Sequence, residues 1–370
     1  MSYEIKLHPA IFAVDKYYEI MLPTNIEKPC LFFVKVGDKC YYDESNGIMR
    51  SKNEIHRVKV PMKALDEAKE YTLSIRPIIE RKPYFTETEE VVEKTYKFYP
   101  VPEKDIRAYH ISDAHNLVEE PLKAANAFGE FDFLILNGDV IDHSGDPSKF
   151  MNIYEICSSL MKGEKPSVFS RGNHDLRGNF AEKFADYTPN HLGNTYYSFR
   201  LGNIWGVLLD CGEDKPDDHP EYGFTVACHV FRERQTEFLK ELIENKKKEY
   251  EAEGIKHKLL ISHNTFTFRL PSPFDIEQEI FGEWIKLLRE EVKPEVMICG
   301  HLHDLNVYYP DNKEFNTNGS ICPVVVGGDV KKREAPFWFA GCGYVFSDDE
   351  IKVIFTDSDG KVIKEETIKK

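Results

Sequence analysis

The first hundred residues alternate apolar and polar positions with a period of two. Tyr71, Leu73 and Ile75 alternate with polar neighbours, and residues 18–22 repeat the pattern. This spacing is typical of half-buried strands, because successive side chains of a strand point to opposite faces. Prolines and glycines separate the short runs. The pattern predicts an all-β sandwich, which we interpret as a separate domain over residues 1–100.

Beyond residue 106 the pattern changes, because apolar strand-like runs alternate with helical stripes. Asp146 followed by Pro147 predicts the start of a helix that continues to Met161. Residues 231–251 and 276–288 carry apolar side chains at helical spacing. These runs predict an α/β or α+β domain.

The end of the chain returns to a strand pattern from residue 323 onward, which indicates a second sheet packed on the first. The polar stretch 99–105 contains two prolines and separates the two patterns. We therefore interpret it as a linker and place the second domain at residues 106–370.

The charge balance excludes several kinds of partner. Lys and Arg number 48 against 63 Asp and Glu, which gives a net charge of −15. Nonspecific nucleic-acid binding and attachment to anionic membranes both need a basic surface, so the charge argues against both. Acidic substrates remain compatible with this charge if metal ions supply positive charge.

The cysteines and the N-terminus predict a cytoplasmic protein. None of the eight cysteines forms a CxxC pair. In a chain of this length we interpret scattered cysteines as reduced thiols rather than as a disulfide framework. Residues 1–12 have neither a basic start nor a continuous apolar stretch, so we expect no signal peptide. No apolar run approaches the ~18 residues of a membrane-spanning helix.

The informative feature is that five apolar runs of the second domain each end in side chains that bind metals or transfer protons. Because ligands bind at the carboxyl ends of the strands in open α/β sheets, we expect these side chains to converge. Nitrogen and oxygen donors without thiolates suit Mn, Fe, Zn, Co or Ni. In chain order, the residues are Asp113 and His115, then Asp139 and Asp142, then Asn173, His174 and Asp175, then His263, and finally His301 and His303.

The residue types fit chemistry at two metal ions. A carboxylate such as that of Asp139 can bridge two cations and hold them about 3.5–4 Å apart. Asn173 offers an uncharged carbonyl oxygen, and His side chains offer neutral donors. Glycines precede Asp139, Asn173 and His301, where we expect them to permit tight turns.

In this order the motifs DxH, GDxxD, GNHD, a single His and GHxH resemble the calcineurin-like metallophosphoesterase superfamily, over about residues 106–356. The resemblance implies two mixed β-sheets flanked by helices, and two divalent or trivalent metal ions. One metal would take Asp113, His115, Asp139 and His303, and the other Asp139, Asn173, His263 and His301. His174 would lie beside the phosphate oxygens, with Asp175 orienting its ring and Asp142 supporting the site from behind the ligands.

The N-terminal region resembles the fibronectin type III-like sandwich of purple acid phosphatases. The run from Leu65 to Tyr71, followed by a strand, resembles the tyrosine corner of such sandwiches. Purple acid phosphatases carry GDxxY, whereas this chain has Asp142 at that place. Serine/threonine phosphatases carry GDxxDRG, whereas here His143 follows the Asp. The resemblance is therefore to the layout of the purple enzymes and not to their metal chemistry.

Three further residues are candidates for substrate contacts. Arg177 follows the GNHD motif, and its planar guanidinium suits a phosphate clamp. Asn116 and His143 directly follow motif residues and are predicted to line the site. Each is also compatible with a solvated loop position.

The resemblance implies hydrolysis of a small phosphorylated substrate, a monoester or a diester. A bridging hydroxide would attack phosphorus and His174 would act as general acid. The alternatives are a nuclease or a phosphoprotein phosphatase on the same fold, or a metal-stabilised binding scaffold without catalysis. The sequence leaves the oligomeric state open.

Overall fold

The computed structural model describes residues 4–24, 27–331 and 334–370. The half of the chain that carries the predicted catalytic residues, from residue 106 onward and called the catalytic half below, is built on two sheets that share one strand. The first contains β11 (Ile106–Ile111), β12 (Phe133–Asn137), β13 (Ser167–Ser170), β20 (Trp338–Phe346), β21 (Glu350–Asp357) and β22 (Val362–Lys369). The second contains β14 (Tyr197–Leu201), β15 (Ile204–Leu208), β16 (His257–Ile261), β17 (Val296–Cys299), β18 (Asp304–Tyr308) and β19 (Val324–Lys331).

Strand β19 joins the two sheets. Residues 324–326 pair in parallel with β17, and residues 329–331 pair antiparallel with β20. Within the first sheet β11, β12 and β13 run parallel, and within the second β15, β16, β17 and β19 run parallel. The carboxyl ends of the parallel strands therefore supply the loops at which ligands are expected.

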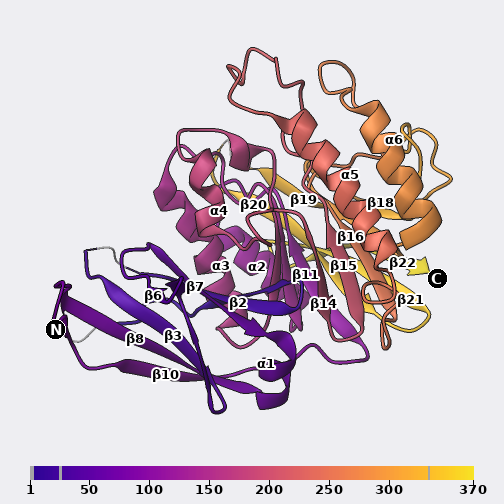
Figure 1. Cartoon of the computed structure of the whole chain (residues 1–370). Coiled ribbons are helices and arrows are strands. Elements are labelled where there is room, and N and C mark those ends of the chain that lie inside the picture. Colours follow the sequence, from indigo (N-terminus) through magenta and orange to yellow (C-terminus); the bar gives the residue numbers. More distant parts are fainter. Residues whose placement is uncertain (1–3, 25–26, 332–333) are drawn as a thin grey trace.

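Helices cover the outer faces of both sheets (Figure 1). On the first sheet α2 (Glu119–Phe128) packs against β20 and β21, and α3 (Met151–Met161) packs against β12. On the second sheet α5 (Cys228–Glu244) and α6 (Gln278–Leu287) pack together over a core that contains Trp284. The short α4 (Phe184–Tyr187) follows β13. The predicted fold class, a two-sheet core flanked by helices, is confirmed.

The predicted helices form with small differences at their ends. A 3₁₀ turn at Pro147–Phe150 precedes α3, and the Asp146 side chain accepts a hydrogen bond from Ser148 N at 3.0 Å, as expected of an N-cap. Helix α5 ends at Glu244 rather than at the predicted residue 251. A polar Asn-Lys-Lys-Lys run follows, and Tyr250 instead packs its ring against Trp205. Among the described residues, no helix combines the length and apolarity that a membrane crossing requires.

The N-terminal region forms two layers of strands and one short helix, α1 (Met62–Ala68). One layer contains β1 (Ala10–Val14), β2 (Tyr17–Pro23) and β7 (Ile55–Pro61). The other contains β3 (Cys30–Val36), β4 (Lys39–Tyr42), β8 (Glu70–Glu80), β9 (Glu87–Thr88) and β10 (Val92–Lys97). The hairpin strands β5 (Glu44–Ser45) and β6 (Ile48–Met49) complete the region, and strands β3 and β4 lie against β7 (Figure 1).

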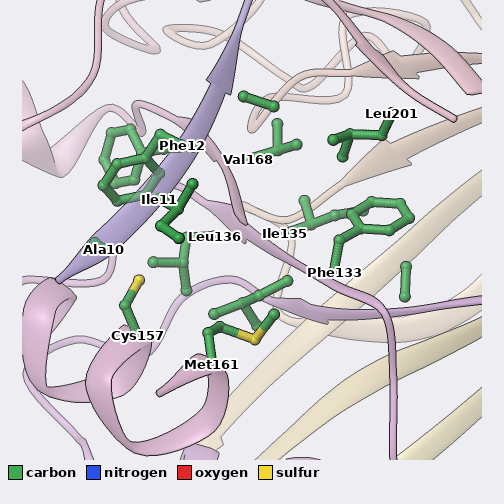
Figure 2. Packing of buried hydrophobic residues seen from close by; sticks show 14 of the residues in the cluster. Ala10, Ile11, Phe12, Phe133, Ile135, Leu136, Cys157, Met161, Val168 and Leu201 are labelled. Atoms are coloured by element: carbon green, nitrogen blue, oxygen red, sulfur yellow. The ribbon is translucent and has the colours of Figure 1, made fainter. Parts of the chain in front are cut away.

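The first of these layers continues the sheet of the catalytic half. Phe12 of β1 pairs in parallel with Ser167 of β13. Figure 2 shows residues of β1 in one cluster with Phe133 and Leu136 of β12 and with Cys157 of α3. The division at residues 1–100 and 106–370 stays a prediction, but β1 packs in the same apolar core as the catalytic strands.

The predicted tyrosine corner is wrong. In such a corner the hydroxyl bonds to the backbone a few residues upstream. Here the Tyr71 hydroxyl donates to the carbonyl of Gly163, which lies in the catalytic half, at 2.7 Å. Tyr71 therefore ties the outer layer of the N-terminal region to the loop that follows α3.

Candidate metal centre

The seven predicted ligands meet where the loops after five strands converge. The first group lies after β11 and β17. The Nε2 atoms of His115 and His303 are 3.4 Å apart, and their rings stack at 5.2 Å. Oδ1 of Asp113 is 3.6 Å from Nε2 of His303. Three donor atoms from two loops therefore face one point.

The second group lies deeper, between the loops after β12, β13, β16 and β17. Nδ1 of His301 is 3.0 Å from Oδ1 of Asn173. Nε2 of His263 is 3.2 Å from Oδ2 of Asp139 and 3.8 Å from Oδ1 of Asp113. Three sets of side chains each bring their donor atoms within 4.8 Å of one another, and Asp139 belongs to two of these sets. The sets are Asp113, His115 and His303; His115, Asp139 and His174; and Asp113, Asp139 and His263.

Hydrogen bonds to the backbone orient these side chains. Nδ1 of His263 donates to the carbonyl of Asn137 at 2.7 Å, which turns Nε2 toward the carboxylates. The backbone N–H of His301 donates to both carboxylate oxygens of Asp113, at 3.1 and 3.0 Å. Bonds of this kind fix which nitrogen of a histidine is free to act as a ligand.

The electrostatics favour a cation among these groups. Burial lowers the pKa of His263, but the carboxylates of Asp139 and Asp113 raise it to about 10. Burial raises the pKa of Asp139, yet His263 brings it well below its usual range. Burial and the charge of His263 lower the pKa of His301 to about 4. The buried carboxylates thus hold negative charge that a proton or a metal ion compensates.

Glycines allow the loops to approach one another closely. Gly138 has φ +76°, so it makes the tight turn that the sequence predicts. At Gly172 a Cβ would overlap the carboxylate of Asp139, and at Gly300 it would overlap Ser112. At these two positions glycine is required because a side chain would not fit beside the carboxylates of Asp139 and Asp113.

His174 lies next to the ligands and differs from them in its contacts. Its ring Nδ1 donates to the carbonyl of Asp142 at 2.8 Å, and its backbone N–H donates to Oδ1 of Asp139 at 2.9 Å. Nε2 is 4.0 Å from the other oxygen of Asp139, and a third of the side chain is exposed. The ring therefore presents Nε2 to the site.

The predicted role of Asp175 as the group that orients this ring is wrong. Its carboxylate accepts a hydrogen bond from Gly172 N at 2.8 Å, whereas the ring of His174 is held by a backbone carbonyl. Burial and the nearby Asp139 raise the pKa of Asp175 to about 8. Asp175 braces the turn that carries Asn173 and His174.

Asp142 links three parts of the site, as its predicted supporting role requires. Oδ1 lies 3.2 Å from Nδ1 of His115, Oδ2 accepts a hydrogen bond from Asn116 at 2.7 Å, and the carbonyl holds His174. Asn116 therefore links the loop after β11 to that after β12, and its predicted substrate contact stays a prediction. His143 is exposed, and its Nδ1 accepts a hydrogen bond from Gly145 N within its own turn.

Comparison with known families identifies this arrangement. The family model of calcineurin-like phosphoesterases matches residues 106–305. The chain belongs to the calcineurin-like phosphoesterase family. The matched span begins at β11 and ends just after His303, so it covers all five loops.

A solved structure extends the likeness in fold beyond the calcineurin-like half. A purple acid phosphatase, PPD1 from yellow lupin (Lupinus luteus) seeds, is similar over 100% of this chain and 76% of its own, with a TM-score of 0.61 and 13% identity. A Vps29 mutant from Entamoeba histolytica covers 72% of this chain and 99% of its own, with a TM-score of 0.31 and 11% identity. A metallophosphoesterase from Sphaerobacter thermophilus covers 68% of this chain and 88% of its own, with a TM-score of 0.25 and 14% identity. The comparison with curated proteins gave no match.

The donor set of this calcineurin-like phosphoesterase fits two cations. Within the described part of the chain, Nε2 of His263 is buried and makes no hydrogen bond, although two carboxylates face it. The clustered donors are nitrogen and oxygen atoms, which suit first-row transition metals. A buried nitrogen without a hydrogen bond, facing two carboxylates, fits the role of a metal ligand.

Arg177 does not have the freedom expected of a phosphate clamp. Its Nε and Nη2 donate to the two carboxylate oxygens of Glu213, each at 2.9 Å, and Nη2 also lies 3.3 Å from Asp214. Both acids belong to the segment between β15 and α5. Neither acid was among the candidate residues predicted from the sequence, although this segment forms an insertion beside the site.

The same segment reaches a predicted metal ligand, His301. Oδ2 of Asp214 is 3.9 Å from Nε2 of His301, and Oδ1 accepts a hydrogen bond from the Tyr222 hydroxyl at 2.9 Å. Asp214 thus connects the insertion to the histidine whose other nitrogen faces Asn173. His219 of this segment lies 3.9 Å from the carboxylate of Glu221, and His229, in the first turn of α5, lies 3.0 Å from that of Glu277.

Proposed function

We propose that the chain hydrolyses small phosphoesters at a dinuclear metal centre. The convergence of donors from five loops around Asp139 is the single observation that supports this most strongly. We assign Asp113, His115 and His303 to one metal and Asn173, His263 and His301 to the other, with Asp139 shared. Bound Mn, Fe, Zn, Co or Ni ions would supply positive charge beside the phosphoryl oxygens and would activate water for attack on phosphorus.

We assign the role of general acid to His174. Its Nδ1 donates to the Asp142 carbonyl, so Nε2 is the nitrogen that faces the site, where Nη1 of Arg177 lies 3.4 Å from it. A proton on Nε2 would pass to the oxygen of the departing alcohol as the P–O bond breaks. The partial exposure of the ring allows a substrate to reach it from solvent.

Two observations favour a small ester over a nucleic acid. The chain carries a net charge of −15. Arg177, after β13, and Lys215, in the segment between β15 and α5, already pair with carboxylates of Glu213, Asp214 and Glu221. A polyanionic strand would find little free positive charge there.

The test measures hydrolysis of p-nitrophenyl phosphate and bis-p-nitrophenyl phosphate by protein loaded with Mn²⁺. Elemental analysis of the same protein gives the number of metal ions per chain. We expect turnover of at least one ester and about two metals per chain. The variant Asp139→Asn should lose metal and activity together, because it weakens the shared ligand. Two metals without turnover of either ester would instead support a non-catalytic scaffold, and cleavage only of a single-stranded oligonucleotide would support a nuclease. The cytoplasmic location and the domain boundary stay predictions.

A further inference from the structure

A cavity of about 1350 Å³ lies between the N-terminal region and the segment around α4. One wall is formed mainly by one face of β7 and the turn before it, and the other mainly by residues 180–190, which include α4 (Figure 1). We call this space the β7 cleft. Of the predicted metal ligands, which all belong to the described chain, none lines it. The cleft is therefore a feature separate from the metal centre.

Hydrogen bonds between the two walls hold them together. Nη2 of Arg57, in β7, donates to the carbonyl of Ala185 at 3.1 Å, and Nη1 donates to that of Thr188 at 3.3 Å. Nη1 also lies 3.5 Å from the buried carboxylate of Glu19, which accepts a hydrogen bond from Asn190 N at 3.3 Å. The cavity is thus built into the fold, and a preformed cavity lowers the ordering cost of binding.

The β7 cleft is richer in positive charge than the chain as a whole. Five Lys and Arg side chains line it against four Asp and Glu, whereas the whole chain has 48 against 63. Two of the four acids are engaged, because Glu19 faces Arg57 and Glu44 accepts a hydrogen bond from Gly47 N at 2.5 Å. The other two acids, Glu54 and Asp186, are exposed. An anion is therefore more favourable here than on the average surface of this acidic chain. The five cations are Arg50, Lys52, Arg57, Lys59 and Lys183.

Three of these lysines bring ammonium groups without carboxylate partners to the cleft. Within the part of the chain that the structure describes, Lys52, Lys59 and Lys183 form no ion pair. All three are exposed, and Nζ of Lys59 donates to the carbonyl of Asn190 at 3.4 Å. Lys52 and Lys59 belong to the N-terminal wall, and Lys183 belongs to the opposite one. Ammonium groups on opposite walls suit a phosphate held between them by charge-assisted hydrogen bonds.

Aromatic side chains complete the lining of the cleft. Tyr41, Phe180 and Tyr187 are half-buried and belong to it. Sites for small organic ligands combine such side chains with a few charged groups, in volumes of about 300–1,000 Å³. A cavity of about 1350 Å³ is larger than inorganic phosphate needs, and it has room for a sugar and a ring as well.

We propose that the β7 cleft binds a small phosphorylated ligand that carries an aromatic ring, such as a mononucleotide. The phosphate pairs with the lysines of the two walls, and the ring packs against Phe180 and Tyr187. This site goes beyond the proposed hydrolysis and does not rest on it, because the lining of the cleft and the clustered metal donors share no residue of the described chain.

Pyridoxal 5′-phosphate is the probe, because it is an aromatic phosphate whose aldehyde condenses with a nearby lysine and releases water. Borohydride reduction of the imine makes the label permanent, and mass spectrometry of the digested full chain measures labelling at each lysine. We expect the three cleft lysines to label faster than Lys247, whose side chain is 81% exposed and lies outside the cleft. Pyridoxal, which lacks the phosphate, should not show this preference. Cleft lysines that label no faster than Lys247 would overturn the proposal.

Protection from labelling identifies the ligand class. The phosphonate analogue of AMP has no phosphoester bond to hydrolyse, and it should slow labelling of the cleft lysines. Methylphosphonate, which has neither sugar nor ring, should protect them much less, and equal protection by the two compounds would overturn the aromatic ligand. Labelling and protection confined to Lys215, which lies beside Asp214, would place the ligand at the metal centre and would also overturn the proposal.

A variant of one wall and a matched control complete the test. Lys183→Gln removes one charged contact, so the concentration of the AMP analogue that halves labelling of Lys59 should rise about tenfold. Lys149 is exposed in the 3₁₀ turn that begins at Pro147 but does not line the cleft, so Lys149→Gln should leave this concentration unchanged. Equal effects of the two variants would contradict the proposal. If neither p-nitrophenyl ester is hydrolysed, the proposed function fails while the labelling still decides whether the cleft binds a ligand.

Discussion

Strand β1 offers a test of whether the N-terminal region folds with the catalytic half. Phe12 is fully buried in β1, and its ring lies 6.3 Å from that of Phe169 in β13. The substitution Phe12→Ala removes a large side chain from the centre of a packed core, which typically costs about 3–5 kcal/mol in free energy of unfolding. Because the phenyl ring touches strands of both regions, the cost should appear in the unfolding of the catalytic half.

The three tryptophans report on that half alone, since all lie beyond residue 106: Trp205, Trp284 and Trp338. Urea unfolding followed by tryptophan fluorescence should therefore show the loss of about 3–5 kcal/mol in Phe12→Ala, as a lower midpoint at a similar slope. Phe85→Ala is the matched control, because Phe85 is 92% exposed and its removal should change stability by no more than about 0.5 kcal/mol.

A variant in the outer layer shows how far the cooperative unit extends. Phe32 of β3 is also fully buried but lies in the layer that does not pair with the catalytic sheet. If Phe32→Ala shifts the tryptophan transition as Phe12→Ala does, the outer layer unfolds with the rest. An unshifted tryptophan transition in Phe12→Ala, with a separate shifted transition in far-UV circular dichroism, would refute the reasoning about β1.

Two further predictions concern histidines. His174→Ala should lose most of the roughly 10²–10⁴-fold contribution of general acid catalysis on an alkyl phosphoester and much less on a p-nitrophenyl ester, and parallel losses with loss of metal would exclude the acid role. His56 pairs with buried Asp43 at 2.6 Å; burial lowers the pKa of His56, but Asp43 and Cys30 raise it to about 9. A folded-state pKa above the unfolded value of about 6.5 means that this stabilisation, on the order of 3 kcal/mol, is complete below pH 6.5 and is lost as the pH rises through 9. Urea unfolding at pH 6 and pH 9.5 should show that decrease in the wild type and a smaller one in Asp43→Asn, and equal decreases in both would contradict the assignment.

The metal centre could be predicted from sequence because its information is local. Each ligand directly follows an apolar strand run, and parallel strands bring such positions to one edge. Asp113, Asp139 and His301 therefore could be placed together without knowledge of the packing. The two-sheet fold was implied by the family resemblance. The strand pattern alone placed the strands after residue 323 in a second sheet, which is wrong, because β20, β21 and β22 join the sheet of β11.

The contacts that sequence reasoning missed are long-range. The carboxylate partner of Arg177 lies 36 residues later, in a segment without periodicity, so an arginine after the GNHD motif is compatible with either a phosphate or an internal acid. A strand pattern likewise specifies which face is apolar but not which strand it pairs with. The pairing of Phe12 with Ser167 across the predicted linker, and the bond from Tyr71 to Gly163, belong to this class.

The backbone of the site shows why these loops must hold one another. Several non-glycine residues there have left-handed φ values, among them Asp113 at 57°, Asp139 at 51° and His301 at 66°. Such conformations cost on the order of 1–3 kcal/mol each and persist where the surroundings enforce them. The enforcing bonds run between loops: Asp113 N–H donates to the Gly138 carbonyl, His115 N–H to the Asp139 carbonyl, and His301 N–H to the Asp113 carboxylate. Each loop is thus kept in its strained conformation by the next, and these bonds between loops fix the positions of the predicted ligand atoms.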